Sequence, residues 1–267
     1  MIDVFIDTNI LHNRNEQLDK ALFVEKLKEI IGEIEINDIY TEIKILLPRM
    51  VLNELYQQQL EMFDDLNKRL ENVSMPNMQY DRAFNYGEYL ETIFKKAIME
   101  LKQGIVAVEV VDFPASDRLN SIISRAIKKE PPFEGKEKHS DKGFKDVLIW
   151  ESIKEYKEKH INDIIVFYCN DNLLASNALR KEFKEDFRDE IYIEQKNALM
   201  KRLTTLCNKN ETVKTFSSQL NERIESCLSH NNEILYDLLM EDPVWNDGDV
   251  ISDFEVKKVN ILNCNDI

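Results

Sequence analysis

The stretch Val4-Phe5-Ile6-Asp7-Thr8-Asn9 continues a short apolar and β-branched run that begins at Ile2. Residues 2–6 predict a buried strand, because strands of a parallel sheet are covered on both faces and carry nearly continuous apolar residues. The run stops at Asp7, so this carboxylate is expected at the carboxyl end of the strand. Ligand-binding side chains of parallel α/β sheets collect at that end. Asp7 is therefore the first candidate for a functional residue.

Similar runs recur along the chain, separated by amphipathic stretches. Further strands are expected at residues 43–47, 105–111, 164–168 and, more weakly, 191–193. Apolar residues at helical spacing predict helices over residues 18–34, 50–73, 82–102, 116–128 and 144–159. Strands that alternate with helices indicate an α/β fold, in which helices sandwich a parallel central sheet in three Rossmann-like layers.

Two regions of the chain depart from this simple alternation. The helical stretch from Met50 to Lys102 is interrupted by Ser74-Met75-Pro76-Asn77, which predicts a helical hairpin projecting as an arm over about residues 50–104. After the last strand, helices are expected over residues 196–207 and 213–240, followed by a strand pair over residues 250–262. We therefore expect a core domain over residues 1–194 and a smaller α+β accessory region over residues 195–267.

The composition of the 267 residues limits the classes of function. The chain has 50 Asp and Glu against 35 Lys and Arg, a net charge of -15, so contact with nucleic acid would require a local basic patch or bound cations. The four cysteines show no Cys-x-x-Cys pairing, which argues against a zinc ribbon or a disulfide framework. Neither a secretion signal nor an apolar run of membrane-spanning length is evident, so a cytoplasmic protein without membrane contact is expected.

Three further acidic residues are expected at the same end of the sheet as Asp7. Asp171 follows the fourth strand, Glu54 lies early in the helix after the second strand, and Asp146 begins a later helix. Four converging carboxylates repel one another unless a cation neutralises them, and hard oxygen ligands suit Mg²⁺ or Mn²⁺. Each acid alone has a structural alternative: Glu54 as a solvated helix residue, Asp146 as a charge favoured at a helix N-terminus, and Asp7 and Asp171 as N-caps.

Aromatic and histidine residues near these acids suggest no further chemistry. The aromatic residues Phe144, Trp150, Phe167 and Tyr168 are expected in the core and not as base-stacking platforms. His12 follows the first strand closely, and a surface or capping role is expected for it.

Four segments resemble the motifs of PIN-domain nucleases and occur in the order of that family. The segments are Phe5–Leu11, Pro48–Leu55, Gly143–Trp150 and Cys169–Asp171. The third has the form found in a branch of bacterial PIN-like proteins, and with the sheet the resemblance spans residues 1 to about 195. In the fourth, Cys169 stands where the family usually has Thr or Ser, which puts the orientation of Asp171 in doubt. Asp141 is a rival or additional ligand beside the third acid.

The resemblance implies a PIN-like fold and the metal-dependent hydrolysis of phosphodiester bonds by an activated water, most often in RNA. The catalytic residues and ligands of Mg²⁺ or Mn²⁺ that it implies are Asp7, Glu54, Asp146 and Asp171. The expected substrate contacts are Asn9, Lys138, Lys142 and Lys145. A solvated lysine-rich loop is an equal alternative for the three lysines.

The expected function is that of an endoribonuclease acting on single-stranded or structured RNA. A structure-specific DNA nuclease and a non-catalytic PIN-like module that binds RNA or protein are the alternatives. A phosphatase of the haloacid-dehalogenase type is disfavoured, because Asn9 stands where its second Asp is needed. The RNA substrate, the choice between a toxin, defence or RNA-processing role, and partnership with a second copy or an inhibitory antitoxin all stay open at this point.

Overall fold

The computed structural model describes residues 1–14, 17–71, 84–133, 142–208 and 215. These residues contain a five-stranded parallel sheet of order β3-β2-β1-β4-β5. Its strands are β1 (Ile2–Ile6), β2 (Ile43–Pro48), β3 (Ala107–Val111), β4 (Ile164–Tyr168) and β5 (Tyr192–Glu194). Central strand β1 is buried along its whole length and pairs Val4 with Ile45 on one side and with Val166 on the other. The parallel sheet expected from the sequence is confirmed.

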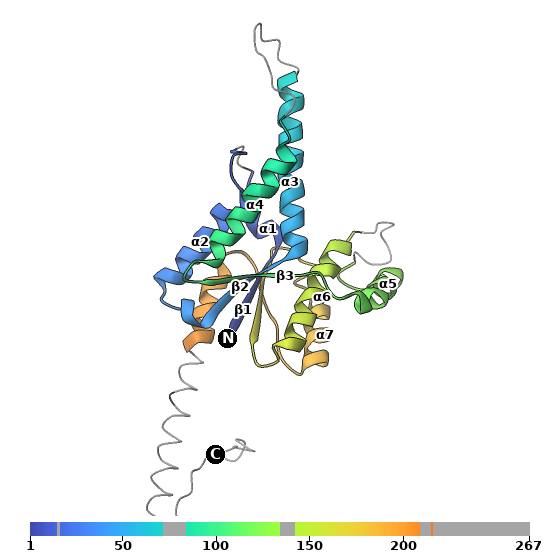
Figure 1. Ribbon diagram of the computed structural model, residues 1–267. Helices are drawn as coiled ribbons and strands as arrows, with labels where there is room; N and C mark the ends of the chain where they lie inside the picture. Colours follow the sequence, from blue (N-terminus) through green and yellow to red (C-terminus); the bar gives the residue numbers. More distant parts are fainter. Residues whose placement is uncertain (15–16, 72–83, 134–141, 209–214, 216–267) are drawn as a thin grey trace, which may run out of the picture. The chain divides into compact units, whose positions relative to one another are not determined.

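Helices cover both faces of this sheet. They are α1 (Thr8–Leu11), α2 (Phe23–Ile36), α3 (Arg49–Glu71), α4 (Tyr86–Lys102), α5 (Leu119–Lys128), α6 (Phe144–Lys159) and α7 (Asn177–Phe187). Short 3₁₀ turns occur at η1 (Tyr40–Glu42), η2 (Ser116–Arg118) and η3 (Lys196–Ala198), and a further helix runs over residues 199–208. Helices α2 and α4 lie on one side of the sheet, and α6 and α7 lie on the other (Figure 1). Strands β2 and β3 lie on one side of β1, and β4 and β5 lie on the other. Because crossovers between parallel strands are right-handed, this change of direction puts the later helices on the opposite face of the sheet.

Helices α3 and α4 form the helical arm that the sequence predicts. The Phe63 and Tyr86 rings stack at 4.1 Å, and the Tyr56 and Phe94 rings meet edge to face at 5.5 Å, so the two helices run antiparallel. The buried Gln59 amide donates to the Tyr86 hydroxyl at 2.9 Å. Figure 1 shows that α3 continues beyond the start of α4 and away from the sheet.

One sequence-based expectation about the core is corrected, and one helix was not expected. Trp150 and Phe167 are fully buried as expected, but Phe144 is 48% exposed, because it is the first residue of α6 and stands outside the contact between helix and sheet. Helix α7 was not among the expected helices. It buries only Leu179 and Phe183 along a charged sequence, so its apolar spacing gives a weak signal.

The C-terminal part of the fold is described only as far as the helix over residues 199–208. This helix packs Leu199, Leu203 and Leu206 into the same core as the strands. Contacts divide the chain into two units, Met1–Lys209 and Asn210–Ile267. The domain boundary expected after Glu194 stays a prediction. The expected elements over residues 213–240 and 250–262 lie outside the described residues, as do Lys138 and Asp141. None of the described helices is long and apolar enough to cross a membrane.

Candidate active site

The end of β1 places Asp7 at the carboxyl edge of the sheet. The backbone N–H of Asp7 donates to the carbonyl oxygen of Tyr168 at 3.0 Å, so pairing with β4 continues to this residue. Helix α1 begins immediately afterwards at Thr8, which turns the chain away from the sheet. As a result the Asp7 side chain is 95% buried, with an exposed fraction of 5%. A carboxylate in such a position is fixed by the central strand.

The loop after β4 fixes Asp171 through the backbone. Its Oδ1 accepts hydrogen bonds from the N–H groups of Leu173 at 2.6 Å and Leu174 at 3.1 Å. The N–H of Asn170 donates to Oδ1 of Asn9 at 3.2 Å, which ties this loop to α1. Asp171 therefore caps its own turn, and a capping role is compatible with metal ligation by the same carboxylate.

Glu54 comes from α3 and makes two contacts with residues of the other motifs. Its Oε2 accepts a hydrogen bond from the Thr8 hydroxyl at 2.7 Å, and its Oε1 accepts one from the Lys145 ammonium at 2.8 Å. These bonds join α3 to α1 and to the first turn of α6. The role of Thr8 was not predicted, although the hydroxyl residue after Asp7 is part of the resemblance to the first PIN motif.

Electrostatics bring Asp146 into the same site. It lies in the first turn of α6, directly after Lys145. Burial, together with the negative charges of Asp171 and Glu54, raises the pKa of Asp146 to about 6, while Lys145 lowers it. Carboxylates that interact in this way share one region of the protein, although they come from separate elements.

Asp7 is perturbed more strongly. Burial is the largest cause that raises its pKa, the charges of Asp146, Glu54 and Asp171 also raise it, and a backbone hydrogen bond at Thr8 lowers it; the result is a pKa of about 7. The charges of the other three predicted acids thus act on Asp7, and those of Asp171 and Glu54 act on Asp146. Because the pKa of Asp7 lies near neutrality, added positive charge at this edge of the sheet would favour its ionised form.

The donor chemistry suits a hard divalent cation, because the four side chains offer carboxylate oxygens. The four carboxylates do not form a closed coordination shell. Among the residues that the structure describes, no three His, Cys, Asp or Glu side chains lie close enough together to hold one ion. The Glu54 carboxylate forms an ion pair with the Lys145 ammonium. A cation that bound here would draw the acids together and compete with Lys145.

Cys169, the departure from the fourth motif, carries no charge into the site. Burial, reinforced by the negative charge of Asp7, raises the pKa of its thiol to about 12. The thiol contacts the backbone carbonyl oxygen of Asp171 at 3.9 Å. Cys169 is fully buried, so it supports the loop that carries Asp171 from beneath.

The remaining predicted residues lie at the edge of the site. Asn9 is exposed and joins α1 to the loop after β4. Lys145 is 56% exposed and contacts Glu54, while Lys142 is exposed just before α6. His12 contacts Gln58 and not one of the four acids: its Nδ1 lies 2.8 Å from the side-chain oxygen of Gln58.

Comparison with known proteins agrees with this arrangement. The PIN domain family matches residues 4–173, a span that contains all four carboxylates. The chain belongs to the PIN domain family. No curated protein and no solved structure matches the chain. PIN domains are commonly metal-dependent nucleases that act on nucleic acid, although some are non-catalytic.

Proposed function

We propose that this PIN-domain protein is a metal-dependent endoribonuclease. The observation that carries the proposal is the raised pKa of Asp7 and Asp146 at the carboxyl edge of the sheet, to which burial and the charges of Glu54 and Asp171 contribute. Carboxyl groups whose pKa is raised both by burial and by several like charges are typical of functional sites. Here the charges come from four separate elements, which a purely structural role does not require.

The proposed cofactor is Mg²⁺ or Mn²⁺. When bound, such an ion supplies a water of lowered pKa and neutralises charge on the phosphate. The protein's own residues prepare the site: β1 holds Asp7, the Thr8 hydroxyl orients Glu54, and the backbone N–H groups after Asp171 orient that carboxylate. Because these bonds fix the oxygens before substrate arrives, little reorganisation is needed during the reaction.

Lys145 has a second part in the proposal. Its ammonium offsets the Glu54 charge in the absence of a metal, and it is sufficiently exposed to reach a phosphate once it leaves Glu54. With Asn9, Lys142 and Lys138, the last outside the described residues, it forms the proposed substrate contacts. RNA, which is a polyanion, then meets a site whose acids are already neutralised.

The test is cleavage by the full-length protein of single-stranded RNA, structured RNA and flap DNA, each with Mg²⁺, Mn²⁺ or a chelator. RNA cleavage with either metal and none with chelator is expected. Asp146→Asn should reduce the rate by on the order of 10²-fold, whereas Asp117→Asn, at an exposed acid on η2, should not change it. Cleavage in chelator would contradict the metal mechanism, preference for flap DNA would reassign the substrate, and no cleavage with any metal would favour a non-catalytic module.

A further inference from the structure

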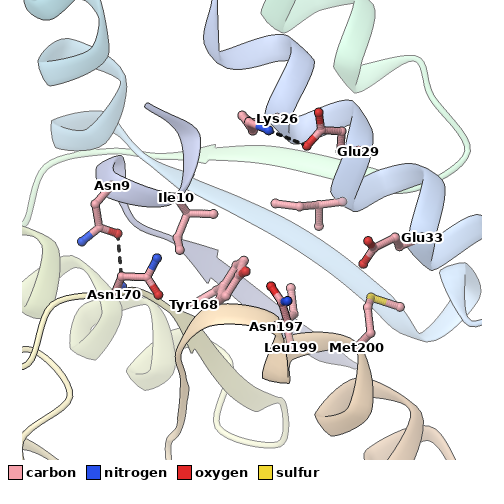
Figure 2. A pocket seen from close by; sticks show the side chains of 11 residues that line it. Asn9, Ile10, Lys26, Glu29, Glu33, Tyr168, Asn170, Asn197, Leu199 and Met200 are labelled. Carbon is pink, nitrogen blue, oxygen red and sulfur yellow. Dashed lines mark hydrogen bonds and ion pairs between the residues drawn. The ribbon is translucent and has the colours of Figure 1, made fainter. Parts of the chain in front are cut away.

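A pocket of about 640 Å³ lies on the α2 side of the sheet. Two of its lining residues, Asn9 and Asn170, lie within two residues of Asp7 and Asp171 in the sequence. Figure 2 shows Asn9 and Asn170 at one end of this pocket, Glu33 and Met200 at the other, and Tyr168 between them. The four acids are not among the described residues that line the pocket. The volume is within the range of small-ligand sites.

The lining of this pocket combines apolar surface with side-chain amides. Ile10, Ile30 and Leu199 supply the apolar part from α1, α2 and the helix over residues 199–208. Asn197 adds a third amide to those of Asn9 and Asn170. Amide groups both donate and accept hydrogen bonds, and an apolar floor suits the face of a planar ring. Such a lining fits a nucleobase better than a phosphate or a sugar.

The charge of the pocket narrows the choice of base. Glu29 and Glu33 lie one helical turn apart on α2, and the Lys26 ammonium pairs with Glu29 at 2.8 Å. Within the described part of the chain, Glu33 makes no ion pair. Burial of the Tyr168 hydroxyl raises its pKa, and the negative charge of Glu33 raises it as well. This end of the pocket is therefore electronegative, so it repels phosphate and favours a neutral group that donates hydrogen bonds.

Guanine is the base that meets this requirement. Its Watson–Crick edge presents two adjacent donors, N1–H and the N2 amino group, which one carboxylate can accept together. Adenine and cytosine present a ring acceptor beside their amino donor, and uracil presents a single N–H between two carbonyl oxygens. An acceptor placed against a carboxylate is repelled, so those three bases fit this end less well.

We propose that the pocket binds a guanine base of the RNA, with the Glu33 carboxylate accepting from its Watson–Crick edge and the neighbouring amides holding the ring. The proposal rests on the proposed nuclease function for the identity of the polymer. Because Asn9 and Asn170 line the pocket and lie close to Asp7 and Asp171 in the sequence, the proposed binding mode directs the phosphate next to this guanine toward the acids. The pocket thereby makes the enzyme selective for cleavage beside guanine.

Binding of free nucleosides tests the pocket without any cleavage. Guanosine, inosine, adenosine, cytidine and uridine carry no phosphate, so neither the metal nor the acids contribute. Saturation-transfer NMR titrations with the full chain should show guanosine binding most tightly. Inosine, which lacks the N2 amino group, should bind roughly tenfold more weakly, because one hydrogen bond to a charged acceptor is lost.

Variants of α2 assign the effect to one carboxylate. Glu33→Gln should weaken guanosine binding by about tenfold or more. The matched control is Glu35→Gln, an exposed acid on the same helix that does not line the pocket and should leave binding unchanged. Equal binding of all five nucleosides, no binding of guanosine, or equal effects of the two variants would overturn the proposal.

Cleavage mapping separates this inference from the proposed function. If RNA is cleaved but guanosine does not bind, the pocket assignment fails while the nuclease proposal stands. If guanosine binds selectively but no RNA is cleaved, base recognition stands and the nuclease proposal fails. Both hold if guanosine binds and the cut sites lie beside guanine in the wild type but lose that preference in Glu33→Gln.

Discussion

Asp3 and Asp7 lie four residues apart, Asp3 near the start of β1 and Asp7 directly after its end. Both are buried: the exposed fraction is 0% for Asp3 and 5% for Asp7. Burial is the largest cause of a raised pKa for each, to about 6 for Asp3 and to about 7 for Asp7. Burial alone therefore does not distinguish Asp3 from Asp7, the proposed catalytic acid.

The charged neighbours of the two acids are what differ. Lys44, His160 and the N-terminal amine lower the pKa of Asp3 and oppose the effect of Asp163. Around Asp7 the charged side chains that act on it are acids. The amino end of the strand thus supplies positive charge from the protein itself, whereas the carboxyl end leaves a deficit that a metal can fill. We take this unbalanced charge, not burial, as the mark of the site.

The largest effect should come from removing each carboxylate in turn. Asp7→Asn should reduce RNA cleavage by on the order of 10²-fold or more, because it removes a proposed metal ligand. Asp3→Asn should stay within about twofold of the wild type in the same assay, because Asp3 lies at the far end of β1. The measurement is the initial rate of RNA cleavage by the wild type and the two variants, at a temperature at which all three proteins are folded. Equal losses of activity in the two variants would contradict the distinction between Asp3 and Asp7.

A second prediction concerns the turn that carries Asp146. Gly143 has φ +108°, and an added Cβ would lie 2.6 Å from the backbone oxygen of Pro132. Its carbonyl also accepts from the Val147 N–H at 2.8 Å at the start of α6. Gly143→Ala should therefore reduce the free energy of unfolding by about 2–3 kcal/mol and weaken cleavage as well.

The matched control for this turn is Gly32→Ala within α2. A Cβ there meets no atom within 4 Å, so the substitution should raise the free energy of unfolding by about 0.5–1 kcal/mol. Urea unfolding of both variants measures the difference. Similar changes in the two proteins would show that the turn before α6 is not constrained by the backbone around Pro132.

A third prediction uses the pH dependence of stability. A carboxyl group whose pKa is higher in the folded than in the unfolded protein loses stabilisation as pH rises. For Asp7 this loss begins near the ordinary Asp pKa of 3.8 and is complete above about 7. In chelator, Asp7→Asn should therefore be more stable than the wild type at pH 8, by on the order of 4 kcal/mol, and the advantage should vanish near pH 4.

Adding Mn²⁺ sharpens that comparison. At pH 8 the ion should raise the unfolding temperature of the wild type more than that of Asp7→Asn, because binding to the folded state stabilises it. Asp3→Asn should respond to Mn²⁺ as the wild type does. Scanning calorimetry at both pH values gives the result, and a wild type indifferent to Mn²⁺ would contradict the metal site.

The smallest expected effect concerns Lys145. Its ammonium competes with a cation for Glu54, so Lys145→Ala should lower the Mn²⁺ concentration needed for half-saturation by about two- to fivefold, the range of an exposed ion pair. Lys159→Ala removes an exposed pair with Glu155 at the other end of α6 and should cause no change. Titration calorimetry can measure both, and weaker Mn²⁺ binding by Lys145→Ala would show that the lysine helps to form the site.

Much of the fold could be predicted because the strands are local apolar runs. Two apolar runs, over residues 2–6 and 164–168, each predict a strand. Both are followed by an acidic motif. Helix α7 escaped prediction because only Leu179 and Phe183 are buried along it. Phe144 was placed wrongly in the core because an aromatic residue at a helix start can face solvent.

The sequence by itself determined the parallel α/β fold, the family resemblance and the four acids as candidates, because strand ends and motif order are properties of the chain. Tertiary structure alone decided their environment: the Thr8 and Lys145 bonds to Glu54, the positive charge around Asp3, and the pocket between Asn9 and Glu33. Burial and Coulomb interactions depend on distances in space between residues far apart along the chain. That is why Asp3 in β1 and Asp7 directly after it, two aspartates of one short segment, have different charged surroundings.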